Sequence, residues 1–224
     1  MTTKHNLLRE SLILLVVVLV ALKILYEFRD VSWIGDYLPT YAAILLIYTP
    51  IIHLTLRGSH QEALLFFEHR WIDVGRSVGL FCAVSLLIFP TFLVLNHYYQ
   101  KVFFHYGLEP APLLPAGTVL LAQLFLVALP EEFFFRGYLQ EQMAGRFHKK
   151  INLLGLSLSQ GAIITCLLFA FAHSLITLQW WHFSIFFPAL VFAWMREKSG
   201  TITASILFHA TSNLLINWMG NSYH

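Results

Sequence analysis

Two adjacent carboxylates and an arginine interrupt an otherwise apolar stretch of the chain, residues 117–140: they are Glu131, Glu132 and Arg136. On a helix, residues four apart share a face, so Glu132 and Arg136 are spaced to form an ion pair. That ion pair accounts for the carboxylate of Glu132 but does not explain the carboxylate of Glu131. Because charges in apolar surroundings are costly, the extra carboxylate favours a functional site over a purely structural ion pair. Arg136 would hold the glutamate pair, with Glu132 as support or a secondary base.

Two of the eleven histidines also lie inside apolar stretches. His173 ends the run Leu-Leu-Phe-Ala-Phe-Ala-His and follows Phe169 by one helical turn. His209 precedes Asn213 by one turn, which places an imidazole and an amide on one helix face. A single histidine on an apolar face is more often a hydrogen-bonded core residue than a catalyst. Two of them, together with an unpaired carboxylate and an amide, indicate a catalytic site.

These residue types suit the attack of water on an amide. A carboxylate can serve as the general base, and an adjacent imidazole can share the water. Glu131 is the predicted base and His173 its partner. His209 and Asn213 could both donate hydrogen bonds to the oxyanion of the tetrahedral intermediate, where the loss of one donor typically costs about 10²–10³ in rate.

The composition indicates the elements that must position these residues. Hydrophobic residues make up 58% of the 224 residues and charged residues only 12%, and the mean hydropathy is +0.67. A soluble domain carries roughly 25% charged residues. The composition and the net charge of +2 exclude a free soluble globule, a disordered tail and a charge-driven nucleic-acid-binding protein. We therefore expect a polytopic membrane protein whose partner is the lipid bilayer, with no nucleic-acid partner.

The apolar stretches predict an all-α transmembrane bundle. A bilayer span needs about 20 residues, and seven candidates fit, with eight as the alternative: residues 11–28, 37–56, 78–99, 117–140, 158–178, 181–195 and 201–219. We expect one membrane domain over residues 1–224, with N-terminal spans in 1–116 that carry no catalytic motif and a catalytic core in 117–219.

The distribution of Lys and Arg predicts the orientation. With the N-terminus inside, the cytoplasmic segments hold ten of these residues and the outer segments only Arg29 and Lys101. This is the bias of the positive-inside rule. We expect a multi-pass protein of the bacterial cytoplasmic membrane, with its N-terminus inside and its C-terminus outside.

With these residues the sequence resembles the CPBP family, the intramembrane proteases that include CAAX prenyl endopeptidases and bacterial bacteriocin-processing or self-immunity proteins. The family motifs EExxxR, FxxxH and HxxxN read here Glu131-Glu132-Phe-Phe-Phe-Arg136, Phe169-Ala-Phe-Ala-His173 and His209-Ala-Thr-Ser-Asn213. Each motif alone is weak. Three in the family's order, each on a predicted span, make a specific signal over residues 118–218.

The resemblance implies an all-helical membrane core and a glutamate-dependent, metal-free peptidase that needs no cofactor. Its substrate would be a membrane-associated protein or peptide. In the roles that the family implies, Glu131 and His173 activate water, His209 and Asn213 stabilise the oxyanion, and Arg136 is structural.

The predicted span ends place these residues at different depths. Glu131 and His209 lie towards the inner face, whereas His173 lies towards the outer one. The resemblance would then require a later start of the fifth span, or helices that are tilted and broken around a cavity. Irregular backbone at such depth is tolerated where it is buried in protein or lines water.

Three other functions use the same residues. Two histidines and a carboxylate could bind catalytic zinc, although the HExxH helix of such proteases is absent. A membrane adaptor or immunity protein would use the charges only to hold its helices together. A transporter would use them as a proton relay, but the paired, inverted halves of transporters are not evident.

Overall fold

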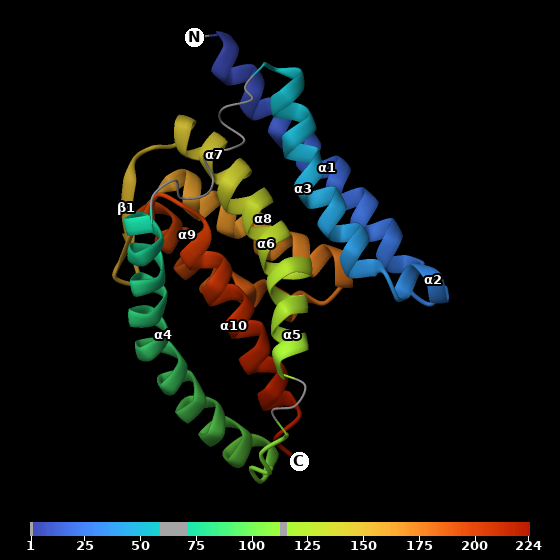
Figure 1. The fold of residues 1–224 in the computed structure, drawn as a ribbon, viewed down its shortest axis with the longest axis vertical. Coiled ribbons are helices and arrows are strands. Elements are labelled where there is room, and N and C mark those ends of the chain that lie inside the picture. The colour runs from blue at the N-terminus through green and yellow to red at the C-terminus, as the bar shows by residue number, and fades with distance from the viewer. Residues whose placement is uncertain (1, 59–70, 113–115) are drawn as a thin grey trace.

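The computed structural model describes residues 2–58, 71–112 and 116–224 (Figure 1). The N-terminal half contains α1 (Thr2–Glu27), α2 (Ser32–Gly35), α3 (Leu38–Leu56) and α4 (Trp71–Tyr99), which continues as the π-helical segment η2 (Gln100–Phe104). The C-terminal half ends with α8 (Gln160–Thr177), the 3-10 helix η5 (Trp180–Ile185), α9 (Phe186–Ser199) and α10 (Thr203–Gly220). The helical fold class is confirmed. A small antiparallel hairpin, β1 (Lys150–Leu153) and β2 (Leu156–Ser159), is the one sheet in the described residues.

Four helical stretches within the described residues are long and apolar enough to cross a membrane: residues 38–56, 71–104, 117–146 and 160–177. They coincide with four of the predicted spans and indicate a multi-pass membrane protein. The other three predicted spans fall on α1, α9 and α10, whose described residues do not reach the same length and apolar character. The helix α9 has only 14 residues, and charged or polar side chains interrupt α1 and α10. Seven spans, and the orientation of the chain, therefore stay predictions.

A single long helix carries the two glutamates, and two of its segments are π-helical. Along it lie α5 (Ala116–Ala122), η3 (Gln123–Ala128), α6 (Leu129–Glu132), η4 (Phe133–Leu139) and α7 (Gln140–Arg146). Pro130 in α6 has no N–H to donate, which weakens regular α-helical bonding around it. Short π-helical insertions are frequent at functional sites. Here they flank the four-residue turn that contains Glu131 and Glu132.

The helix α8 runs antiparallel to α7, η4 and α6, and the hairpin joins them. Gly161 lies against the backbone of Met143 and Ala144, so closely that a Cβ atom there would come within 2.5 Å of Ala144 N. Further along, the rings of Phe135 and Phe169 are 4.8 Å apart. Small residues allow this close approach of helices in membranes. The contact at Gly161 therefore sets the register in which α8 meets the glutamates.

This register corrects the expected difference in depth between Glu131 and His173. The glutamate helix does not end at residue 140 but continues to Arg146, and α8 begins at Gln160. Glu131 and His173 are then similarly far from the hairpin that joins the two helices, and their side chains meet. The helix continues for about two more turns because Gln, Glu, Met, Ala and Arg, which make up most of residues 140–146, favour helical backbone.

The core lies where α6–α7, α8, α9 and α10 meet, with α1 and α3 on one side. The helix α4 arches along the opposite side (Figure 1) and packs through Phe81 and Phe89 against Phe192 and Phe208 of α9 and α10. None of the residues in the most apolar 18-residue stretch of this helix is buried inside the protein. Such a surface suits contact with lipid.

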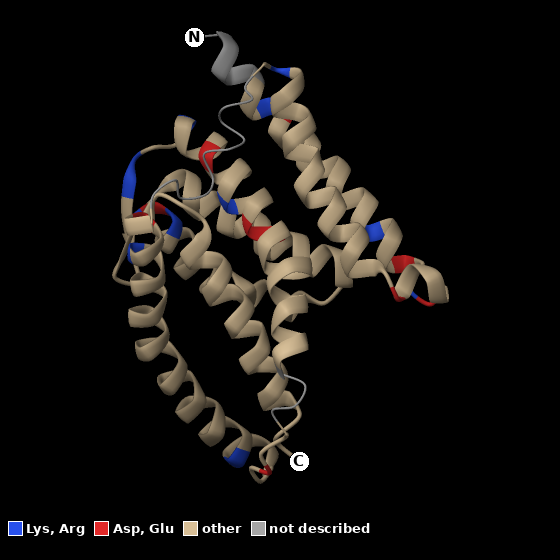
Figure 2. Cartoon of the chain, viewed as in Figure 1, with Lys and Arg blue, Asp and Glu red and all other residues tan. Residues whose placement is uncertain are grey.

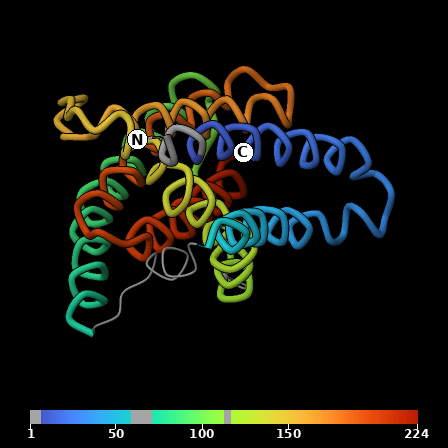
Figure 3. The backbone as a smooth tube through the Cα atoms, turned by 90° about the horizontal axis from the view of Figure 1, so that it is seen from above, coloured from blue at the N-terminus to red at the C-terminus, as the bar shows by residue number. Residues whose placement is uncertain are grey.

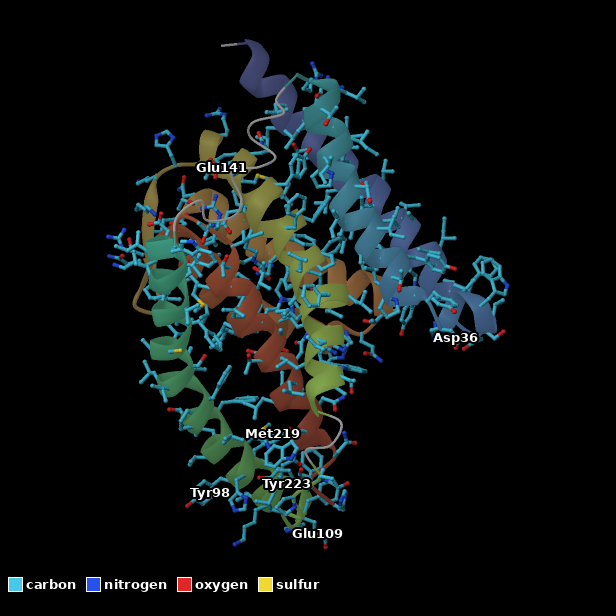
Figure 4. All side chains as sticks on the ribbon, viewed as in Figure 1. Asp36, Tyr98, Glu109, Glu141, Met219 and Tyr223 are labelled. Atoms are coloured by element: carbon cyan, nitrogen blue, oxygen red, sulfur yellow. The ribbon has the colours of Figure 1, made fainter. Side chains whose placement is uncertain are left out.

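The last residues of the chain close one end of the bundle. Tyr223 pairs as an isolated bridge with Leu108 and its hydroxyl contacts His97 Nδ1 at 3.1 Å. Figure 4 shows Tyr98, Met219 and Tyr223 gathered there, where α4 approaches the end of α10. Viewed from above, α1 and α3 extend together as an arm away from this bundle (Figure 3). The arm therefore contributes to the core only along part of its length.

Candidate active site

Glu131 faces two histidines from two other helices. Its Oε2 atom lies 3.7 Å from Nε2 of His173 on α8 and 3.8 Å from Nε2 of His209 on α10. The Glu131 side chain is 19% exposed and that of His173 28%, whereas the His209 side chain is 7% exposed. The structure thus brings three of the predicted residues together around Glu131 Oε2, an atom that is itself buried and has no hydrogen-bond partner in the described residues.

The backbone of α8 orients the His173 ring. Its Nδ1 atom lies 2.9 Å from the carbonyl oxygen of Phe169, and a carbonyl oxygen only accepts hydrogen bonds. Nδ1 therefore carries the proton and donates it. In the neutral ring, Nε2 then presents a lone pair towards Glu131. Phe169 also packs its ring 4.4 Å from the imidazole, which explains the FxxxH spacing.

Glu132 and Arg136 form a fully buried ion pair at 3.2 Å, both with 0% side-chain exposure. The carboxylate of Glu132 also accepts a 3.0 Å hydrogen bond from Nδ1 of His209. Arg136 donates to the carbonyl of Ala189 and lies over the ring of Phe169, 4.2 Å from its centroid. Within the described residues no ion pair joins Arg136 to Glu131. Arg136 therefore holds Glu132 rather than both carboxylates.

Asn213 lies one turn beyond His209 on α10, where it meets the segment η3. Its Nδ2 atom donates a 2.9 Å hydrogen bond to Oε1 of Gln123. Gln123 precedes Glu131 by two helical turns on the same long helix. No direct contact joins Asn213 to Glu131 or His173 in the described residues. Gln123 was not a predicted site residue, and its only sequence signal is an amide inside an apolar run.

No group of three His, Cys, Asp or Glu side chains in the described parts of the chain is arranged to hold a metal ion. The site is a cluster of ionisable side chains from two glutamates, two histidines and an arginine. It has one buried layer, Glu132, Arg136 and His209, and one partly accessible layer, Glu131 and His173.

A family model described as type II CAAX prenyl endopeptidase Rce1-like matches residues 112–215. This part of the chain is therefore similar to the Rce1-like family. The match includes the whole cluster together with Gln123 and Asn213, and confirms the resemblance that the three motifs indicated. The similarity to the Rce1-like family suggests an intramembrane protease of the CAAX type, a hydrolase. Comparison with curated proteins and with solved structures gave no match.

Proposed function

We propose that the protein is an intramembrane endopeptidase that hydrolyses a peptide bond of a membrane-associated protein or peptide. One observation carries the proposal. In the segment that matches the Rce1-like family, Glu131 Oε2 faces the Nε2 atoms of both His173 and His209 at 3.7–3.8 Å. The family description makes a prenylated CAAX peptide the first substrate to try.

The nucleophile in this mechanism is water shared by Glu131 and His173. Separations of 3.7 Å are too long for a direct hydrogen bond and suit a bridging water. Both facing atoms are acceptors, so the water donates one hydrogen to each and directs its oxygen lone pair at the substrate carbonyl. As the C–O bond forms, one proton passes to the Glu131 carboxylate. When the C–N bond breaks, the same group returns that proton to the leaving amine.

The buried layer explains how His209 could stabilise the oxyanion. Its Nδ1–H is donated to Glu132, so a second donor at Nε2 requires the imidazolium form. Two carboxylates and one guanidinium leave the cluster one negative charge in excess, and a protonated His209 balances it. Buried charges are stable when they are paired in this way. His209 would then donate from Nε2 to the developing negative charge.

Asn213 would supply the second oxyanion donor. An amide nitrogen has two hydrogens, and only one is used in the bond to Gln123. The other remains for the substrate. In this arrangement Glu132 orients His209 in the way that Gln123 orients Asn213.

The test compares membrane and secreted peptides from cells that express the wild type, Glu131→Gln or Glu141→Gln. Glu141 is the matched control because it lies on the same long helix, at the surface (Figure 4), with a side chain 62% exposed. We expect precursors to accumulate only with Glu131→Gln, at normal membrane abundance. Equal processing by Glu131→Gln and the wild type would refute the proposal and favour a membrane adaptor.

A further inference from the structure

The hairpin between the two catalytic helices has a defined edge. Leu154 and Gly155 form its two-residue tip, with φ of 53° and 82°. Two positive φ angles are the signature of a type I′ turn, which closes on a hydrogen-bonded pair. That closing pair is Leu153 and Leu156. Hydrogen-bonded and non-hydrogen-bonded pairs then alternate along the two strands.

This alternation determines which backbone groups point outward. Ile151 and Leu158 form the next bonded pair, whereas Asn152 and Lys150 belong to non-bonded pairs. Two contacts agree with this assignment: Gln160 N–H donates to the Lys149 carbonyl oxygen, and the outward N–H of Ser159 donates to Glu197. The N–H and C=O groups of Lys150 and Asn152 therefore face away from β2.

The two edges of the hairpin differ. On the β2 edge the Glu197 carboxylate accepts the outward N–H of Ser159. On the β1 edge the outward groups of Lys150 and Asn152 have no hydrogen-bond partner in the described residues, and both residues are exposed. Figure 3 shows the hairpin projecting from the helices. An exposed edge of this kind is a template for another extended strand.

Basic residues surround the open edge. Arg146, His148 and Lys149 come directly before β1 and are exposed, and Lys198 is exposed at the end of α9. Figure 2 shows basic residues concentrated at this corner of the molecule. Two carboxylates of this region are already paired, Glu197 with Lys150 and Glu141 with Arg196. The surroundings of the β1 edge therefore favour a strand that carries negative charge.

The edge lies within reach of a substrate held at Glu131. Arg146, the end of the helix, comes fifteen positions after Glu131, which corresponds to about 22 Å at 1.5 Å per helical residue. An extended peptide covers that distance in about seven residues at 3.3 Å each. One substrate chain can thus occupy the cluster and the hairpin at the same time.

We propose that the outer edge of β1 binds an acidic, extended segment of the substrate, about seven residues from the bond that is cut. This inference rests on the proposed peptidase function. Backbone hydrogen bonds to Lys150 and Asn152 would give affinity, and the basic residues would select acidic segments. The edge is a binding site and takes no part in the chemical step.

The test uses Asn152→Pro and the matched control Ser157→Pro. Proline at an outward position removes one outward N–H and leaves the hairpin's own bonds intact. The substrates are a farnesylated CAAX peptide with an N-terminal extension of about twelve residues that is acidic around the seventh, and the same peptide without the extension. We expect Asn152→Pro to raise KM about fivefold for the long peptide only, with kcat unchanged. Ser157→Pro should leave both substrates unaffected.

A second variant with a reversed charge, Lys149→Glu, keeps the test independent of whether the proline variant folds. Lys149→Glu should weaken binding of the acidic long peptide and improve binding of one whose extension carries lysines. Unchanged KM values in both variants, while the wild type cleaves and Glu131→Gln does not, would overturn this inference and leave the peptidase function standing. Loss of binding to anionic vesicles in Lys149→Glu, without an effect on either peptide, would assign the basic corner to lipid headgroups instead.

Discussion

Gly161→Ala tests whether the contact between α7 and α8 positions the proposed catalytic residues. The added Cβ would lie 2.5 Å from Ala144 N and 2.5 Å from the carbonyl carbon of Met143. Ordinary contacts begin near 3.4 Å, so the helices must separate by about 0.9 Å, the difference between 3.4 and 2.5 Å. Both obstacles are backbone atoms, which cannot turn aside as a flexible side chain would. Overpacking of this kind typically costs about 1–3 kcal/mol.

The same displacement moves His173 relative to Glu131, because His173 lies on the shifted helix. Misplacement of a catalytic group by about 1 Å can cost on the order of 10²-fold in rate. We expect Gly161→Ala to unfold at a lower temperature in detergent micelles and to cleave the farnesylated CAAX peptide about 100-fold more slowly. Thermal unfolding and kcat, measured on the same purified sample, separate the two effects.

Gly145→Ala is the matched control, since its added Cβ would meet no atom within 4 Å. In a helix this change is neutral or stabilising by up to about 1 kcal/mol. Its rate should equal that of the wild type. If Gly161→Ala behaves like Gly145→Ala in both measurements, the helix contact does not set the geometry of the site.

Three further predictions follow from single contacts. Gln123→Leu removes the acceptor that orients Asn213 and should lower kcat at least about tenfold with little change in KM, whereas Gln123→Glu, which keeps an acceptor, should restore most of the rate. Tyr138→Phe leaves the partly buried His53 ring without its 2.8 Å donor at Nδ1 and should cost about 1–3 kcal/mol in SDS-induced unfolding. Treatment with 1,10-phenanthroline should leave the cleavage rate unchanged; inhibition that added zinc reverses would support the zinc-dependent alternative.

The residues of the cluster could be predicted because polar groups inside apolar helices are rare and their spacing is local. Glu131, His173 and His209 each stood out within one helix, and the structure brings them together. The ion pair of Glu132 and Arg136 followed from the i, i+4 rule alone.

What the sequence did not reveal depends on contacts between distant segments. The depth of His173 was predicted wrongly because the end of the glutamate helix was placed at residue 140, before the polar turn that ends at Arg146. The roles of Gln123 and Gly161 arise only when another helix packs on them. The hairpin was missed as well, since its four-residue strands are too short to give a clear alternation.

A double-mutant comparison tests most directly whether Glu131 and His173 activate one water molecule. The measurement is kcat for the purified wild type, Glu131→Gln, His173→Gln and the double variant on one substrate. Residues that act as a unit give strongly non-additive losses. We predict a large loss in each single variant and a double variant no slower than the slower of the two. Substantial turnover by Glu131→Gln, or losses that multiply in the double variant, would contradict the account.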